Sequence, residues 1–162
     1  MDVATGIVYP LVRETRTEAD FKEWLSEMIK SDPTATQWHF VMDRLNTHQS
    51  ESAVKIVAEI EGTPREELGE KGKSGILKNM KSRMKYLTNT EHKVIFHYTP
   101  KHASWLNQIE IWFSILSRRY LKRKSFNSKE ELKKGLCSFV DFFNKTMAKP
   151  FKWTYAGRPL QA

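Results

Sequence analysis

Residues 99–113 have the sequence TPKHASWLNQIEIWF, which places a single carboxylate, Glu110, in a strongly apolar helical run after Pro100. Its nearest neighbours in sequence are large and apolar, namely Ile109, Ile111, Trp112 and Phe113. An unpaired carboxylate buried among such side chains is energetically costly, so it needs an explanation. Two explanations stay open at this point. Glu110 lies on a narrow polar stripe of an otherwise buried helix, or it is a metal ligand or acid–base group held in a cleft.

Two short apolar segments upstream of this stretch are typical of strands. Residues 37–43 form an apolar run that ends in Asp43, and residues 93–98 lead directly to Pro100. The first of these is predicted to be a buried strand. Because the strands alternate with helical segments, the order favours an α/β fold with crossover helices. In such sheets functional groups gather at the carboxyl ends of strands, which is where Asp43 stands.

Three further segments have the apolar spacing of amphipathic helices. The first follows an N-terminal cap at Thr17 and ends before Pro33. The second is capped by Ser50 or Ser52, and the third opens with a capping box at residues 128–131. These helices supply apolar faces with which a sheet forms a core.

The remaining segments are less regular. Residues 3–12 are rich in β-branched and aromatic side chains around Gly6, which predicts a strand or a hairpin. Residues 61–74 are rich in glycine and charge, which predicts a loop, and residues 75–87 have the pattern of a basic amphipathic helix. Residues 149–155 alternate basic and aromatic side chains in an extended tail, which either packs on the body or stacks on nucleic acid.

The composition is that of one globular domain with a basic excess. The chain has 162 residues, a formal net charge of +8 and a pI of about 9.6, which favours a polyanionic partner such as nucleic acid over a neutral one. The single cysteine, Cys137, excludes an intrachain disulfide and a cysteine-rich zinc site. No apolar run approaches membrane-spanning length and the first residues do not resemble a signal peptide, so we expect a cytoplasmic protein without membrane contact.

Basic side chains concentrate in two places. One is the predicted helix at residues 75–87, and the other is the segment 118–124, at the end of a helix expected to continue from Glu110 to about Leu121. Both patterns fit a solvated helix face or helix terminus as well as a surface that contacts phosphates. The candidate DNA-binding residues are Lys78, Lys81, Arg83, Lys101, Arg118, Arg119, Lys122 and Arg123.

Asp43 and Glu110 are the carboxylates that the fold could bring together, since each follows a predicted strand. Hard divalent cations such as Mg²⁺ are held by a few carboxylates, with waters and substrate phosphates completing the shell. Two such ions activate a water or a 3′-hydroxyl and stabilise the leaving oxygen in phosphodiester chemistry. By contrast, His92, His97 and His102 do not share one helix or strand face, which disfavours a zinc site built from them.

Three segments together carry a resemblance to a known family. Residues 41–48, VMDRLNTH, resemble the strand-end segment that bears the second acid of DDE transposases in the bacterial insertion-sequence branch of the mariner superfamily. Residues 100–113 resemble the segment that bears their third acid, and residues 149–155 are similar to the tail of one subgroup. The resemblance covers nearly the whole chain, and residues 100–113 are its most specific part.

The resemblance implies an RNase H-like fold, with Asp43 and Glu110 as catalytic carboxylates that bind Mg²⁺ or Mn²⁺. The activity that it implies is metal-dependent cleavage and strand transfer of transposon-end DNA, in the bacterial cytoplasm at the nucleoid. Residues 1–162 would then be a partial catalytic domain with a basic insertion at about residues 61–88 and an extended tail at about residues 148–162. The insertion accounts for a separation between the two acids that is longer than is usual in the family.

The sequence departs from the family pattern at its start. The family's first acid lies on a strand before the one that opens this chain, and Asp2 does not match it. We therefore expect an N-terminally truncated catalytic domain with impaired activity, acting as a homodimer or together with a segment from an upstream reading frame. The alternative is a non-catalytic DNA-binding or dimerising module that regulates transposition.

Overall fold

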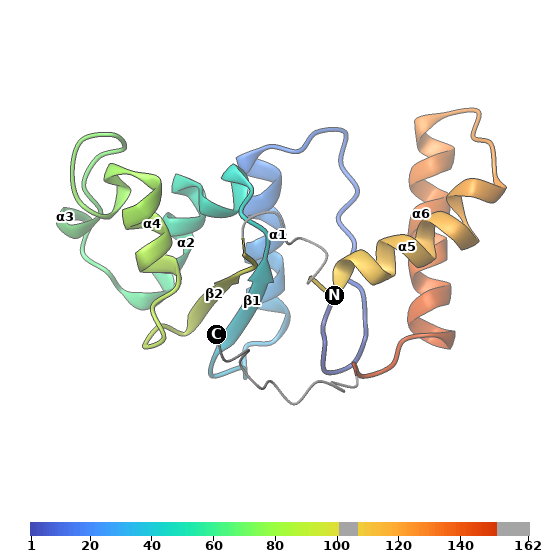
Figure 1. Ribbon diagram of the computed structural model, residues 1–162, viewed down its shortest axis with the longest axis horizontal. Coiled ribbons are helices and arrows are strands. Elements are labelled where there is room, and N and C mark those ends of the chain that lie inside the picture. The colour runs from blue at the N-terminus through green and yellow to red at the C-terminus, as the bar shows by residue number, and fades with distance from the viewer. Residues whose placement is uncertain (101–106, 152–162) are drawn as a thin grey trace, which may run out of the picture. The chain divides into compact units, whose positions relative to one another are not determined.

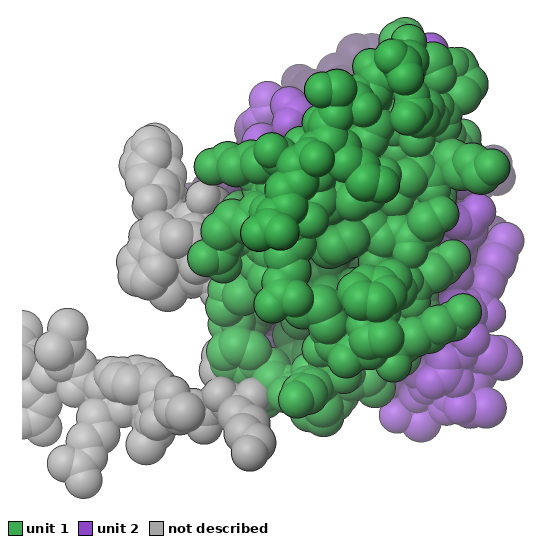
Figure 2. All heavy atoms as spheres, turned by 90° about the vertical axis from the view of Figure 1, so that its right-hand side faces the viewer, with its two compact units in different colours: residues 1–12, 108–162 green, residues 13–107 purple. Residues whose placement is uncertain are grey.

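The computed structural model describes residues 1–100 and 107–151, and the chain divides into two compact units. Unit 1 consists of residues 1–12 and 108–162, and unit 2 of residues 13–107 (Figure 2). Unit 2 contains α1, β1, η1, α2, α3, η2, α4 and β2, and unit 1 contains α5, η4 and α6 (Figure 1). Each unit has its own hydrophobic core.

The sheet of unit 2 consists of two short parallel strands. Strand β1 (Trp38–Met42) pairs with β2 (Val94–Tyr98), with Trp38 opposite Val94 and Met42 opposite Tyr98. Both predicted strands are confirmed, and so is the parallel pairing that the alternating strand–helix order indicates. The described residues thus have α/β architecture.

Strand β1 is less buried than its sequence predicts. Its burial alternates along the strand, and the Val41 side chain is 52% exposed. The expectation of a fully buried strand was wrong because only one face of β1 packs on helices, as the alternation shows. The buried core of unit 2 consists of Leu25, Met42, Ala53, Val54, Ile56, Val57, Leu77, Leu87, Val94 and Phe96.

The first two helices follow their sequence signals closely. Helix α1 (Glu18–Ser31) begins at a capping box in which the Thr17 side chain and Asp20 satisfy each other's backbone amides. Helix α2 (Glu51–Glu61) is capped by Ser50, whose hydroxyl accepts a hydrogen bond from the Ala53 amide. Both caps act within four residues, which explains why the sequence predicts them well.

The segment at residues 61–88 differs in detail from its prediction. The predicted loop contains the short helix α3 (Arg65–Leu68), and the predicted helix at residues 75–87 is divided into η2 (Ile76–Lys78) and α4 (Met80–Leu87). The division occurs at Asn79, which forms a capping box with Ser82 and so starts a new helix.

The regular elements of unit 1 in its described part are helices. Helix α5 (Ile109–Arg119) leads through η4 (Leu121–Arg123) to α6 (Lys129–Thr146). Only half of the predicted capping box forms at α6: Ser128 accepts from the Glu131 amide, but the Glu131 carboxylate accepts from the Asn127 amide instead. The core of the unit is formed by Val8, Trp112, Leu116, Phe139, Val140 and Phe143.

The first residues of unit 1 form a turn and no strand, so the predicted strand or hairpin was wrong. The Gly6 amide donates to the Asp2 carbonyl and the Asp2 amide donates to the Ile7 carbonyl, both at 2.8 Å. Val8 then exchanges two hydrogen bonds of 2.9 Å with the Asn144 side chain on α6. Val8, one of the apolar residues of the predicted strand, belongs to the helical core instead. The Asn144 side chain makes the hydrogen bonds to its backbone that a neighbouring strand would otherwise make.

Gly6 offers a test of this N-terminal docking. It has a φ of 78°, and a Cβ added there would overlap the backbone of Lys149. Gly62, at the end of α2, has a similar φ of 67°, but the space that a Cβ would occupy there is open. A left-handed alanine alone costs about 1–2 kcal/mol, so we predict that Gly62→Ala loses that amount of unfolding free energy. We predict that Gly6→Ala lowers the unfolding free energy by more than Gly62→Ala does, and that it also exposes the Val8 amide to hydrogen exchange. Equal effects of the two substitutions would contradict the packing against Lys149.

The carboxyl ends of the two strands are tied together by three hydrogen bonds. The Thr99 amide donates to the Met42 carbonyl at 2.8 Å, and Arg44 Nε donates to the Thr99 carbonyl at 3.1 Å. The Tyr98 hydroxyl donates to the His48 carbonyl at 2.8 Å. Burial raises the pKa of Tyr98 above its ordinary value, so this hydroxyl keeps its proton and remains a donor.

Replacing Tyr98 by phenylalanine gives a prediction with a pH dependence. Near neutral pH we expect Tyr98→Phe to lower the unfolding free energy by about 1–2 kcal/mol, because the His48 carbonyl loses its donor. The raised pKa favours the neutral phenol in the folded state, so this contribution is complete below the ordinary pKa of 10.0 and declines above it.

Urea titrations of the wild type and of Tyr98→Phe should therefore show that the difference between their unfolding free energies becomes smaller as the pH rises above 10.0. The control is Tyr9→Phe, which removes the same oxygen from a side chain that is 42% exposed. A constant difference between wild type and Tyr98→Phe across this range would contradict the prediction.

Candidate functional site

Asp43 directly follows β1 and its side chain is held in a defined orientation. Its Oδ1 lies 2.7 Å from Nδ1 of His48 and accepts a hydrogen bond of 3.2 Å from the Leu45 amide. The Asp43 carbonyl lies 3.3 Å from the same imidazole nitrogen. Because both neighbours of Nδ1 are acceptors, the proton of a neutral His48 belongs on Nδ1.

His48 is itself fixed from two directions. Its ring lies 4.9 Å from the ring of Phe21 on α1, and its carbonyl accepts the hydrogen bond from Tyr98 on β2. The chain of contacts from Tyr98 through His48 therefore sets the position of the Asp43 carboxylate. Within the described residues, Oδ2 of Asp43 accepts no hydrogen bond, which leaves this oxygen open.

The role of His48 was not predicted from the sequence, although residues 41–48 contain it. The available signal was a histidine five residues after a strand-end acid, a spacing that a one-turn helix converts into contact. Here that helix is η1 (Asn46–Gln49). The signal is weak because it depends on a 3₁₀ turn that the sequence does not specify strongly.

Glu110 lies in the first turn of α5 and is exposed. The position is a solvated one, in which a carboxylate near a helix N-terminus is stabilised by the helix dipole. The helix is not otherwise buried around this acid, because the flanking Ile111 and Phe113 side chains are 52% and 48% exposed. Exposure removes the desolvation cost and leaves the carboxylate available to a ligand.

The two acids belong to different units, Asp43 to unit 2 and Glu110 to unit 1. In residues 1–100 and 107–151, no group of three or more histidine, cysteine, aspartate or glutamate side chains is placed to hold a metal ion. This finding also covers His92 and His97, whereas His102 lies outside the described residues.

The candidate DNA-binding residues have different surroundings. Arg83 is buried, and its guanidinium donates to the carbonyls of Gln49 at 2.8 Å and Leu77 at 3.3 Å, so it holds α4 against its neighbours. Lys101 lies outside the described residues. The exposed members are Lys78, Lys81, Arg118, Arg119, Lys122 and Arg123.

In the described part of the chain, no helix has the length and hydrophobicity that spanning a membrane would require. Neither the curated proteins nor the solved structures contain a match to this chain. The family model described as "DDE superfamily endonuclease" matches residues 1–133, a range that includes both Asp43 and Glu110. The chain therefore belongs to the DDE superfamily endonuclease family.

Proposed function

We propose that the chain is part of a transposase that cleaves transposon-end DNA and joins it to a target with the help of Mg²⁺ or Mn²⁺. DDE superfamily endonucleases act on DNA, generally use divalent metals and have an RNase H-like fold, with which the parallel strands of unit 2 are compatible. The observation that carries the proposal is the Asp43 carboxylate, oriented by His48 at the carboxyl end of β1 with one oxygen open.

Asp43 and Glu110 are suited to a hard divalent cation. Both offer carboxylate oxygens, which Mg²⁺ and Mn²⁺ prefer, and Oδ2 of Asp43 accepts no hydrogen bond among the described residues. Hydrogen bonds from neighbouring groups orient ligating carboxylates, and His48 would have that role for Asp43. When bound, the metal would activate a water or a 3′-hydroxyl and stabilise the leaving oxygen.

Two carboxylates are a small ligand set for this chemistry, because affinity for these cations depends on the number and geometry of the ligands. We propose that a further acidic ligand comes from another segment, encoded upstream or carried by a second copy of the chain in a homodimer. Residues 1–162 alone would then bind the metal weakly and have impaired activity. Such a protein would work at the bacterial nucleoid.

The exposed basic residues would hold the DNA backbone. Lys78 is the last residue of η2 and Lys81 lies on α4, both in unit 2, and Lys122 lies on η4 in unit 1. Lysine and arginine contacts to phosphates make binding dependent on salt, since bound DNA releases condensed counterions. Arg83 is not included in this surface, because two backbone carbonyls already accept from its guanidinium.

The metal assignment can be tested without measuring cleavage. We predict that Asp43→Asn and Glu110→Gln each weaken Mn²⁺ binding by at least about tenfold, measured by electron paramagnetic resonance of free Mn²⁺. The matched controls are Asp141→Asn and Glu130→Gln; Glu130 occupies the first turn of α6 as Glu110 does in α5. Controls that lose as much affinity as the site variants would show only diffuse charge attraction and refute the assignment.

The activity is tested with DNA that carries the ends of the encoding element, Mg²⁺ and the upstream-encoded segment. Nicking should require both acids, and adding the upstream segment should raise its rate. If the chain nicks such DNA and Asp43→Asn has an unchanged rate, the assignment of the catalytic acids is wrong.

A second function, a non-catalytic DNA-binding or dimerising module that regulates transposition, is supported by one observation. No group of three candidate ligands for a metal occurs in the part of the chain that the structure describes. Salt-dependent DNA binding that is unchanged in Glu110→Gln, together with the absence of metal binding, would favour this function over the catalytic one.

A further inference from the structure

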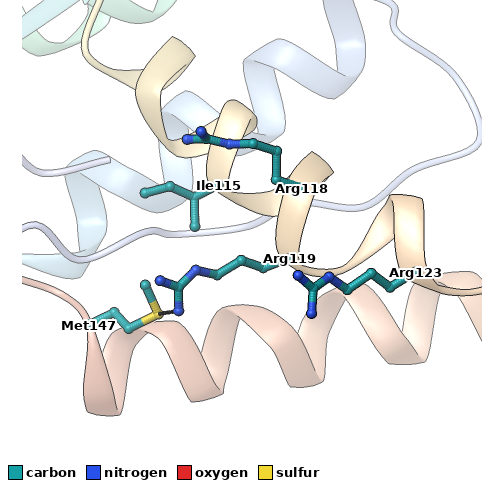
Figure 3. Close-up of a pocket in the computed structure, with 5 residues that line it drawn as sticks. All are labelled: Ile115, Arg118, Arg119, Arg123 and Met147. Atoms are coloured by element: carbon teal, nitrogen blue, oxygen red, sulfur yellow. Dashed lines mark hydrogen bonds between the residues drawn. The ribbon is translucent and has the colours of Figure 1, made fainter.

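A pocket of about 330 Å³ in unit 1 is lined by three arginines and two apolar side chains. The lining residues are Ile115, Arg118, Arg119, Arg123 and Met147 (Figure 3). Arg119 and Arg123 extend in the same direction beside α6, while Arg118 lies across Ile115 from them (Figure 3). The arginines come from α5 and η4, and Met147 is the residue at the end of α6.

The positive charge of this pocket is not balanced by nearby carboxylates. Among the described residues, none of the three arginines forms an ion pair. Arg118 Nε donates to the Ser114 carbonyl at 3.3 Å, and Arg119 Nη1 lies 3.7 Å from the Met147 sulfur. Both contacts leave most guanidinium N–H groups unused. Three adjacent cations without a counter-ion are a favourable site for an anion, and guanidinium groups suit phosphate in particular.

The size and the apolar part of the lining restrict the ligand further. Pockets for small ligands range from roughly 300 to 1,000 Å³, so this one fits a single nucleotide-sized group and not a duplex. A phosphate alone would leave Ile115 and Met147 without a partner. A nucleotide also presents a sugar and a base, which pack on apolar side chains and on the planes of arginines.

We propose that this pocket binds one unpaired nucleotide, with its phosphate on Arg119 and Arg123 and its sugar or base against Ile115 and Met147. In a paired duplex the base is stacked inside the double helix and cannot enter the pocket. A duplex end or a distorted base-pair step leaves a base unpaired and able to enter. The inference rests on the proposed action on DNA, since it assigns to unit 1 a contact with the unpaired strand. A free nucleoside monophosphate and a nucleotide within a strand would present the same chemical groups to this pocket.

The test is a titration of the full chain, followed by nuclear magnetic resonance of backbone amides. The probes are inorganic phosphate, thymidine, thymidine 5′-monophosphate and a short oligothymidylate. We expect the monophosphate to bind more tightly than phosphate or thymidine, with shifts concentrated in α5, η4 and the end of α6. Arg119→Gln and Arg123→Gln should each weaken this binding by roughly tenfold or more, as expected for the loss of a charged hydrogen bond. Lys133→Gln, which removes a charge from an exposed position on α6, should leave it unchanged.

The outcomes separate the pocket from simple attraction of anions. Equal affinity for phosphate and the monophosphate, equal losses in all three variants, or no binding of the monophosphate would each overturn the proposal. Tighter binding of the oligothymidylate than of the monophosphate identifies a strand as the source of the nucleotide, and the reverse order identifies a free nucleotide.

A further comparison distinguishes this inference from the proposed function. A hairpin-closed duplex without free ends should still bind through its phosphates, because its paired bases cannot enter the pocket. If the duplex binds and the monophosphate does not, the pocket proposal fails and action on DNA stands. If neither binds the chain, both fail.

Discussion

The parallel register of β1 and β2 places Met42 opposite Tyr98, and the position of Asp43 depends on that alignment. Because both strands run in the same direction, their carboxyl ends meet at one edge, where Thr99 and Arg44 connect them. Tyr98 then reaches the carbonyl of His48, whose ring holds the Asp43 carboxylate. A shift of one residue in the register would turn Tyr98 away from His48, since side chains alternate between the faces of a strand. The orientation of the acid is thus a consequence of backbone pairing.

Local signals in the sequence predicted the elements of unit 2 well, and tertiary features less so. The caps at Thr17 and Ser50 act through groups within a few residues, so they can be recognised from the sequence. The half-exposed face of β1 could not be predicted, because apolar residues such as Val41 do not reveal which neighbours cover them. The prediction of a strand at the start of unit 1 was wrong for a similar reason. The partner of Val8 is the Asn144 side chain, 136 residues away in the sequence.

The arginines show how one residue type serves two purposes that the sequence does not distinguish. Arg83 stands among lysines in a basic stretch, yet its guanidinium is buried and satisfies the carbonyls of Gln49 and Leu77. Arg119 and Arg123 also stand in a basic stretch, but they are exposed and have no ion pair among the described residues. A buried donor must be hydrogen-bonded within the protein, whereas an exposed one remains free for a ligand. Burial, which depends on the fold, therefore separates the structural arginine from the candidates for phosphate contact.

Asp43 and Glu110 differ in how much of their geometry their own unit provides. Asp43 is oriented before any ligand arrives, because His48 and the Leu45 amide engage one of its oxygens. Glu110 is exposed in the first turn of a helix, where the dipole stabilises its charge without fixing its side chain. Binding a small cation requires near-ideal ligand geometry, so a flexible carboxylate loses conformational entropy that a fixed one does not. Of the proposed metal ligands, Asp43 would be the fixed one, and Glu110 would become ordered when the metal or the DNA binds. The exposure of Glu110 is then compatible with a catalytic role, because an acid that is ordered by its ligand need not be buried in its absence.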